Sequence, residues 1–98
     1  MSLPVIMRPL AEADVVEIFG DLDFIRPGLG KRFIARLREA LDRVECMPEM
    51  YGAVWQDVRA VKLRKFRYVV YYVMLADHVE VLAVLHGSRD ESVWKSRV

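Results

Sequence analysis

The spacing of apolar residues changes near the middle of the chain, from a helical period to a strand period. After a short β-prone stretch at residues 4–7, apolar residues recur every three or four positions, which predicts a helix from about residue 9 to 24. Pro27 and Gly28 end this helix. The stripe expected to face the core consists of Ala13, Val15, Val16, Ile18, Phe19 and Leu22.

A second amphipathic helix is predicted from about residue 28 to 46, and Pro48 ends it. Because only a short break separates the two helices, they are expected to form an antiparallel hairpin. The core stripe of the second helix consists of Phe33, Leu37, Ala40, Leu41 and Val44.

The second half of the chain has the composition and alternation of β-strands. Residues 47–57 are interpreted as a loop, and strands are predicted at 59–63, 68–75 and 79–85. Short turns between these strands favour an antiparallel meander. In the last strand, one face is expected to carry Val79, Val81, Ala83 and Leu85.

The residues from Ser88 to Glu91 have the spacing of a capping box, which predicts a short C-terminal helix that covers Val93 and Trp94. The complete order of elements is therefore β-α-α-β-β-β-α. Residues 1–98 are expected to form one α+β domain, in which an N-terminal strand and an antiparallel helical hairpin pack on an antiparallel sheet.

The formal net charge of +1 conceals two halves of opposite charge. Residues 1–57 carry 7 basic and 10 acidic side chains, and residues 58–98 carry 8 basic and 4 acidic side chains, so the halves have net charges of −3 and +4. The near-neutral total excludes a uniformly basic nucleic-acid coat protein. The segregation predicts that the two halves present different faces to different partners.

Composition limits the chemistry further. A single cysteine, Cys46, excludes an internal disulfide and suits a reducing, cytoplasmic location. The longest apolar run, residues 68–76, has nine residues and is too short to span a bilayer. The two histidines, His78 and His86, are expected at opposite ends of one strand, so neither a metal site nor another cofactor is predicted.

The strongest candidate for a binding surface is a run of five cations without an acid between residues 59 and 67. Such a run suits phosphates or an acidic peptide, whereas on a solvated edge strand lysines merely discourage sheet-to-sheet association. A partner surface is favoured because no acid nearby in the sequence neutralises the charge, although strand alternation prevents all five side chains from sharing one face. The run consists of Arg59, Lys62, Arg64, Lys65 and Arg67.

His86 is a candidate general acid or base because it ends an apolar strand close to Ser88, Arg89 and Asp90. The simpler interpretation, a strand-end histidine bonded to the following loop, is favoured over catalysis. At least two of the three strand tyrosines are expected to pack in the core rather than stack on bases: Tyr68, Tyr71 and Tyr72.

The ordered pattern of nearly the whole chain resembles the RelE/ParE superfamily of bacterial type II toxins, also called plasmid-stabilisation proteins. The resemblance begins with R-P-L-A-E-A-D-V-V-E-I at residues 8–18 and continues through the second helix to Met47-Pro48. It is strongest in F-R-Y-V-V-Y-Y-V at residues 66–73 and in V-E-V-L-A-V-L-H-G-S-R-D at residues 79–90, followed by Trp94.

The superfamily implies a toxin that a co-encoded antitoxin holds inactive in a hetero-oligomeric complex. RelE-like members cut messenger RNA on the ribosome without a metal, and ParE-like members bind DNA gyrase without chemistry of their own. The residues here are closer to the ParE-like pattern. Tyr68 stands where many of the ribonucleases have an arginine, Arg67 lies on the opposite strand face, and Gly87 takes the place of a second arginine.

The resemblance therefore implies a gyrase-directed toxin that is not an enzyme, with a ribosome-dependent mRNA endonuclease as the alternative and a degenerate, non-toxic binding module as the second alternative. The residues expected to bind the antitoxin or the target are Arg59, Lys62, Arg64, Lys65, Arg67, Tyr68, His86, Arg89 and Trp94. A ribonuclease would draw on Arg59, Lys62, Arg64, Arg67, His86 and Arg89.

Overall fold

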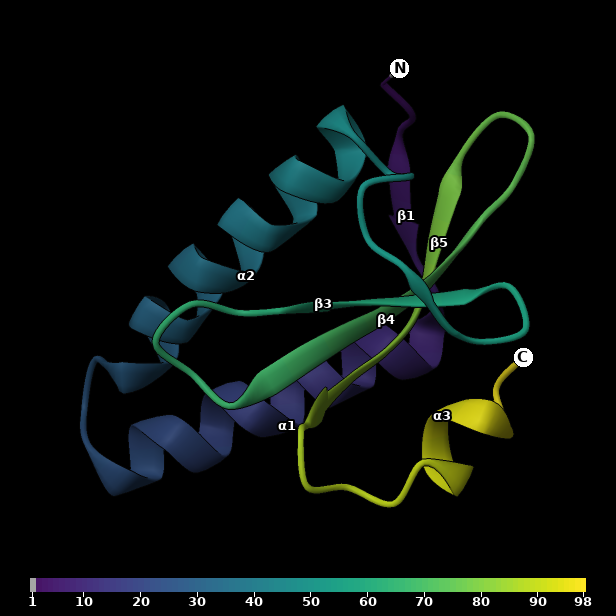
Figure 1. Cartoon of the computed structure of the whole chain (residues 1–98). Coiled ribbons are helices and arrows are strands. Elements are labelled where there is room, and N and C mark those ends of the chain that lie inside the picture. Colours follow the sequence, from purple (N-terminus) through teal and green to yellow (C-terminus); the bar gives the residue numbers. More distant parts are fainter. Residues whose placement is uncertain (1) are drawn as a thin grey trace.

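A hairpin of two long helices packs on a five-stranded sheet in this computed structural model, which describes residues 2–98 (Figure 1). This architecture confirms the predicted α+β class. The helices are α1 (Pro9–Ile25), α2 (Leu29–Cys46) and α3 (Ser92–Lys95). The strands are β1 (Val5–Met7), β2 (Ala53–Trp55), β3 (Val58–Lys62), β4 (Tyr68–Met74) and β5 (Val79–His86).

The order of the strands in the sheet is β1-β5-β4-β3-β2. Strands β3, β4 and β5 form the predicted antiparallel meander, while β1 pairs in parallel with β5, so the sheet is mixed. Strand β2 lies in the segment that was predicted to be a loop. Its three residues are too few to show an alternation, and pairing with β3 holds them extended.

The sheet has a hydrophobic core on each face. On one face, Phe33 and Val44 of α2 pack with Tyr72 of β4, and the predicted core stripe of α2 is confirmed. On the other face, Trp94 of α3 packs with Val73 of β4. Across residues 2–98, no helix combines the length and the apolar content of a membrane-spanning segment.

Helix α1 buries only part of its predicted stripe, of which Val15, Ile18 and Leu22 are confirmed. Ala13 and Val16, which were expected in the core, are exposed. The helix carries apolar residues around most of its circumference, so its periodicity fits more than one register and packing on the sheet selects one of them. The positions that pack against the sheet are Ala11, Val15, Ile18 and Leu22.

Strand β5 departs from strict alternation. Two consecutive residues of β4, Tyr71 and Tyr72, pair with Ala83 and Val81, which leaves Leu82 as the extra residue of a bulge. The prediction of a single face from residue 79 to 85 is therefore wrong, because the bulge reverses the residues that follow it. The α1–α2 side receives Val79, Val81 and Val84, and the α3 side receives Leu82, Ala83 and Leu85.

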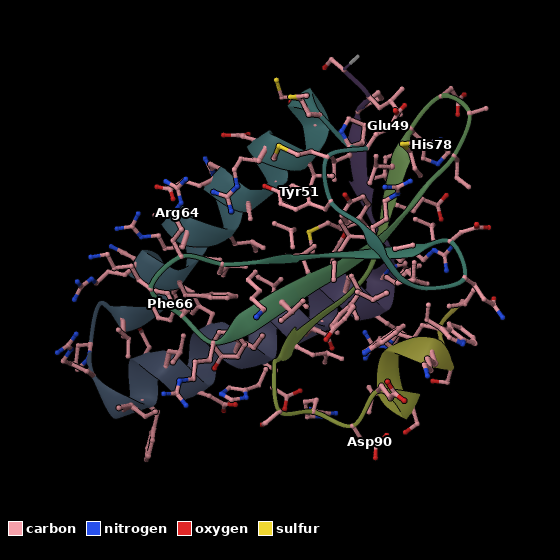
Figure 2. All side chains as sticks on the ribbon, viewed as in Figure 1. Glu49, Tyr51, Arg64, Phe66, His78 and Asp90 are labelled. Carbon is pink, nitrogen blue, oxygen red and sulfur yellow. The ribbon has the colours of Figure 1, made fainter. Side chains whose placement is uncertain are left out.

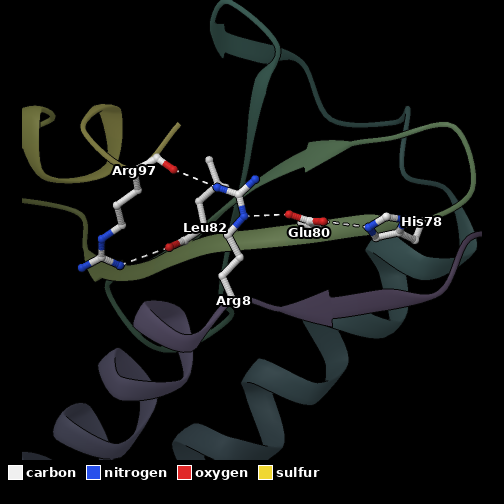
Figure 3. A network of polar contacts seen from close by, with 5 residues as sticks. All are labelled: Arg8, His78, Glu80, Leu82 and Arg97. Carbon is white, nitrogen blue, oxygen red and sulfur yellow. Dashed lines mark hydrogen bonds and ion pairs between the residues drawn. The ribbon is translucent and has the colours of Figure 1, made fainter.

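Beyond Val81, β5 extends past the end of β1, and side chains bond to its backbone there. The Val84 N–H donates to Asp14 Oδ2 at 3.0 Å. Arg97 Nη1 donates to the Leu82 carbonyl at 3.1 Å, as Figure 3 shows. Arg97 also pairs with Asp14, at N–O distances of 2.6 and 3.1 Å. These bonds attach α1 and the C-terminal segment to the sheet.

A second polar network holds the start of β5 (Figure 3). Arg8 donates from Nε to Glu80 at 2.7 Å and from Nη1 to the carbonyl of Arg97 at 2.8 Å. His78 bonds through Nδ1 to Asp77 at 2.7 Å and through Nε2 to Glu80 at 2.8 Å. The hydrogen bond to Asp77, followed by the bond to Glu80, raises the pKa of His78. The same two bonds lower the pKa of the Asp77 and Glu80 carboxyl groups.

The short C-terminal helix is confirmed, but it begins later than the capping-box spacing predicts. The Ser88 hydroxyl bonds to His86 Nδ1 at 2.8 Å instead of capping a helix. The N-cap residue of α3 is Glu91, which makes no side-chain cap bond, and the N–H of Ser92 donates instead to Asp90 Oδ1 at 2.8 Å. An aspartate two residues before the donor amide forms this bond readily, whereas Ser88 lies four residues before it.

Candidate binding surface

One cation of the basic run is held by the fold. Arg59 lies on β3 opposite Tyr72, on the α1–α2 side of the sheet. Its Nη1 donates to the carbonyl of Tyr51 at 2.5 Å and to that of Glu49 at 3.3 Å; both residues are labelled in Figure 2. Arg59 therefore fixes the loop between α2 and β2, and its guanidinium is engaged within the molecule.

The other four cations of the run, Lys62, Arg64, Lys65 and Arg67, are exposed at the end of β3 and in the turn to β4. In the part of the chain that the structure describes, none of these four side chains forms an ion pair. Their charges are therefore directed to solvent or to a partner, as expected of a surface that attracts a negatively charged molecule.

The β3–β4 turn and α2 enclose a groove with a volume of about 410 Å³, hereafter the basic groove. Its apolar lining comes from Leu29, Ala35 and Phe66, and Figure 2 shows Phe66 in the turn beside α2. Arg36 pairs with Glu39 inside the groove at 3.1 Å, and three further cations remain. The cations around the groove are Arg26, Arg32, Arg36 and Lys65.

Two of these groove residues, Arg32 and Arg36, were missed in the sequence because they lie off the core stripe of α2 and far from the basic run. The available signal was their i, i+4 spacing, which places both on one side of the helix. Sequence spacing does not reveal that the β3–β4 turn lies beside the same side of α2.

The end of the sheet brings two other candidates together. Tyr68 and His86 are cross-strand partners whose ring centroids lie 5.5 Å apart at an interplanar angle of 86°. His86 Nδ1 accepts a hydrogen bond from the Ser88 N–H at 3.1 Å, so Nε2 carries the proton of the neutral ring. A hollow of about 150 Å³ beside His86 is also lined by Arg89 and by three carboxylates of α1. His86 thus has the turn contact expected of a strand-end histidine.

The aromatic candidates are mostly packed. Tyr72 is fully buried, its hydroxyl donates to the Pro48 carbonyl at 2.7 Å, and burial raises its pKa to about 12. The Tyr68 ring lies 5.3 Å from that of Phe33, and partial burial raises its pKa. The prediction that at least two strand tyrosines pack in the core is confirmed.

Trp94 occupies the opposite side of the sheet from the α1–α2 hairpin. Its ring stacks on that of Tyr71 at a centroid distance of 4.6 Å and an interplanar angle of 14°, and the residue is 5% exposed. Lys95 lies over the Trp55 ring at 5.1 Å. In this structure Trp94 belongs to the core beneath α3.

The residues that a ribonuclease would draw on are distributed over several places. Arg59 bonds to the α2–β2 loop, away from the others. Lys62 and Arg67 line a hollow of about 240 Å³ together with Gly87, Lys62 and Arg89 line a second hollow of about 570 Å³, and His86 and Arg89 line the hollow beside α1. Among residues 2–98, no three His, Cys, Asp or Glu side chains are grouped so that they could hold a metal ion. This distribution suits contact with an extended partner surface.

Comparison with known proteins identifies the family. The model of the family described as the ParE toxin of type II toxin-antitoxin system, parDE, matches residues 5–91. The chain belongs to the ParE toxin family. The match includes α1, α2 and all five strands, and thus both the basic groove and the His86 end of the sheet. The resemblance to ParE-like members is confirmed, while no curated protein sequence matches the chain.

A solved structure described as the chromosomal ParDE TA system from P. aeruginosa contains a chain similar to this ParE-family protein. The two chains are 13% identical, the alignment covers 87% of this chain and 96% of that chain, and the TM-score is 0.76. At this identity the likeness establishes the ParE-like fold alone. Helix α3, with Trp94, begins after the last residue of the family match.

Proposed function

We propose that this ParE-family chain is the toxin of a type II toxin–antitoxin pair, that a co-encoded antitoxin neutralises it, and that it inhibits DNA gyrase by binding. The family match over residues 5–91 carries the proposal. The exposed cations of the β3–β4 turn and the basic groove supply the surface that contacts the target. A charged, open surface of this kind gives fast, salt-dependent association with a large acidic partner.

The position of Tyr68 supports binding rather than RNA cleavage. A ribonuclease of the superfamily needs cations that stabilise the charge of the phosphorane and a group that accepts the 2′-hydroxyl proton. At the strand position where many such enzymes have an arginine, this chain has Tyr68, whose ring packs against Phe33. The neighbouring Arg67 is exposed in the turn, and Arg59 bonds to backbone carbonyls.

Induced expression in a bacterial host tests the proposal, with and without the product of the adjoining gene. Growth arrest that the neighbour relieves is expected, together with blocked supercoiling when the purified chain is added to gyrase and relaxed plasmid. Cleavage within translated messenger RNA, found by mapping transcript ends, would instead favour the endonuclease. Harmless accumulation of folded protein would support the non-toxic binding module.

A further inference from the structure

Helix α1 has a second apolar face, directed away from the sheet. Val16 is 73% exposed and Phe24 is 92% exposed, and Ala13 and Gly20 are exposed between and beside them. At i, i+3, i+7 and i+11 these four residues form one line along the helix, about 16 Å long. Hereafter this line, Ala13, Val16, Gly20 and Phe24, is the outer face of α1.

The outer face is not explained by the core. The sheet-facing stripe of α1 already supplies the core residues, and a helix that is apolar on opposite sides is ordinarily covered on both. Single exposed apolar residues are common on protein surfaces, but a line of them on one helix marks an interaction site. The charge pattern around the line indicates what covers it.

Helix α1 carries five acids and no base between residues 9 and 25. Asp14 pairs with Arg97, and Asp23 Oδ1 accepts a hydrogen bond from the Gly30 N–H at 2.8 Å. The remaining three acids are exposed and form no ion pair within residues 2–98: Glu12, Glu17 and Asp21. Two copies of the chain joined through this face would set these carboxylates against one another, which disfavours self-association.

The shape of the face suits a helix. A methyl group built at Gly20 meets no atom within 4 Å, so the backbone is open to close approach at the middle of the line. Side chains of a crossing helix can therefore enter between Val16 and Phe24, as ridges enter grooves in helix packing. Lys or Arg residues flanking the apolar stripe of such a helix would lie near Glu17 and Asp21.

We propose that the outer face of α1 binds an amphipathic helix of the co-encoded antitoxin, whose apolar stripe covers Val16 and Phe24 and whose basic flanks pair with the acids of α1. This inference rests on the proposed function. The antitoxin is the occupant, rather than the target, because permanent complexes bury the more apolar surfaces, whereas the exposed cations of the basic groove suit a transient encounter.

The double variant Val16→Gln/Phe24→Gln tests this assignment. Glutamine keeps the helix propensity and removes the apolar surface, so the variant is expected to fold like the wild type. Its growth arrest should persist, but the antitoxin should no longer relieve it, and the Kd for the purified antitoxin should rise about 100-fold, as for the loss of interface hot spots. The matched control is Leu75→Gln, an exposed apolar residue at the β4–β5 turn, which should leave rescue intact.

Other outcomes separate the two proposals. An adjoining gene product that binds wild type and double variant equally overturns the α1 assignment and leaves the proposed function standing. Loss of growth arrest with antitoxin binding retained assigns the face to the target and also overturns it. A wild-type dimer in analytical ultracentrifugation that the double variant abolishes shows a second copy as the occupant. A wild-type chain that neither arrests growth nor binds the neighbour contradicts the proposed function itself.

Discussion

The outer face of α1 and the basic groove lie on the two helices of one hairpin, but they differ in both charge and apolar exposure. The α1 face combines exposed Val16 and Phe24 with free carboxylates, whereas the basic groove has a modest apolar lining and an excess of cations. Burial of apolar surface gives long-lived complexes, and charge mainly accelerates and steers encounter. The difference teaches that a 98-residue chain has room for two surfaces of opposite charge, one acidic and apolar and the other basic.

The acids of α1 and the basic run of residues 59–67 each include one charged residue that serves the fold. Asp14 on α1 bonds to Arg97 and to the β5 backbone, and Arg59 on β3 bonds to two carbonyls of the α2–β2 loop. A count of acids or bases along the sequence therefore overestimates the charge available to a partner. Substitutions of single charged residues can separate the charges that contact a partner from those that stabilise the fold.

Reversal of two groove charges, Arg32→Glu/Lys65→Glu, should produce the largest effect. We expect growth arrest to disappear, because target association becomes about 10-fold slower or more when complementary charges are reversed. Antitoxin binding should be retained. The control is Arg38→Glu, an exposed α2 arginine outside the groove. Colony counts after induction measure the effect, and a fully toxic double variant would remove the basic groove from the target surface.

Asp14→Ala should reduce stability by about 3 kcal/mol, because it leaves the Arg97 guanidinium and the Val84 N–H without their partner in a mostly buried position. The exposed acid Glu17 on the same helix offers the control, and Glu17→Ala should change stability by less than about 0.5 kcal/mol. Urea denaturation gives both values. Equal effects would mean that Asp14 belongs with the surface acids.

Arg59→Ala should cost about 2 kcal/mol, the usual contribution of hydrogen bonds from a charged group. Arg64→Ala, in the exposed turn labelled in Figure 2, should cost less than about 0.5 kcal/mol and should act on toxicity instead. Thermal unfolding and growth assays of the two variants form the test. A toxin that loses activity but no stability on Arg59→Ala would contradict the structural role.

The smallest expected effect is the pH dependence from His78. Its pKa lies above the usual value because of the bonds to Asp77 and Glu80, so its stabilising contribution is complete below about pH 6.5 and falls as the pH rises through the folded-state value. The Tm difference between wild type and His78→Gln should therefore be larger at pH 6 than at pH 8. A difference that does not change with pH would count against the network.

The parts of the fold that the sequence predicts best are those with one dominant periodicity. Helix α2 has a single apolar stripe, and β4 is apolar on both faces, so both were placed to within a residue or two. Helix α1 is apolar on opposite sides, so Val15, Ile18 and Leu22 of its predicted stripe are confirmed, whereas Ala13 and Val16 are exposed. The bulge at Leu82 follows from pairing between β4 and β5, which the alternation of one strand does not contain.

The candidate surface was predictable to a similar degree. The basic run was evident as a cluster of charges, but only the structure separates Arg59, which bonds to the loop, from the exposed cations of the turn. Arg32 lies more than 25 residues from that run and joins it through the packing of α2 beside the turn. The outer face of α1 was hidden for the opposite reason, since Val16 was interpreted as a core residue.

Inhibition of purified gyrase tests the central claim most directly. Supercoiling of relaxed plasmid is measured with the wild-type chain, with Val16→Gln/Phe24→Gln and with Arg32→Glu/Lys65→Glu, each with and without the antitoxin. We expect the wild type and the α1 variant to inhibit equally, only the wild type to be relieved by the antitoxin, and the groove variant to leave supercoiling intact. Supercoiling that continues at full rate in the presence of the wild-type chain would contradict the account.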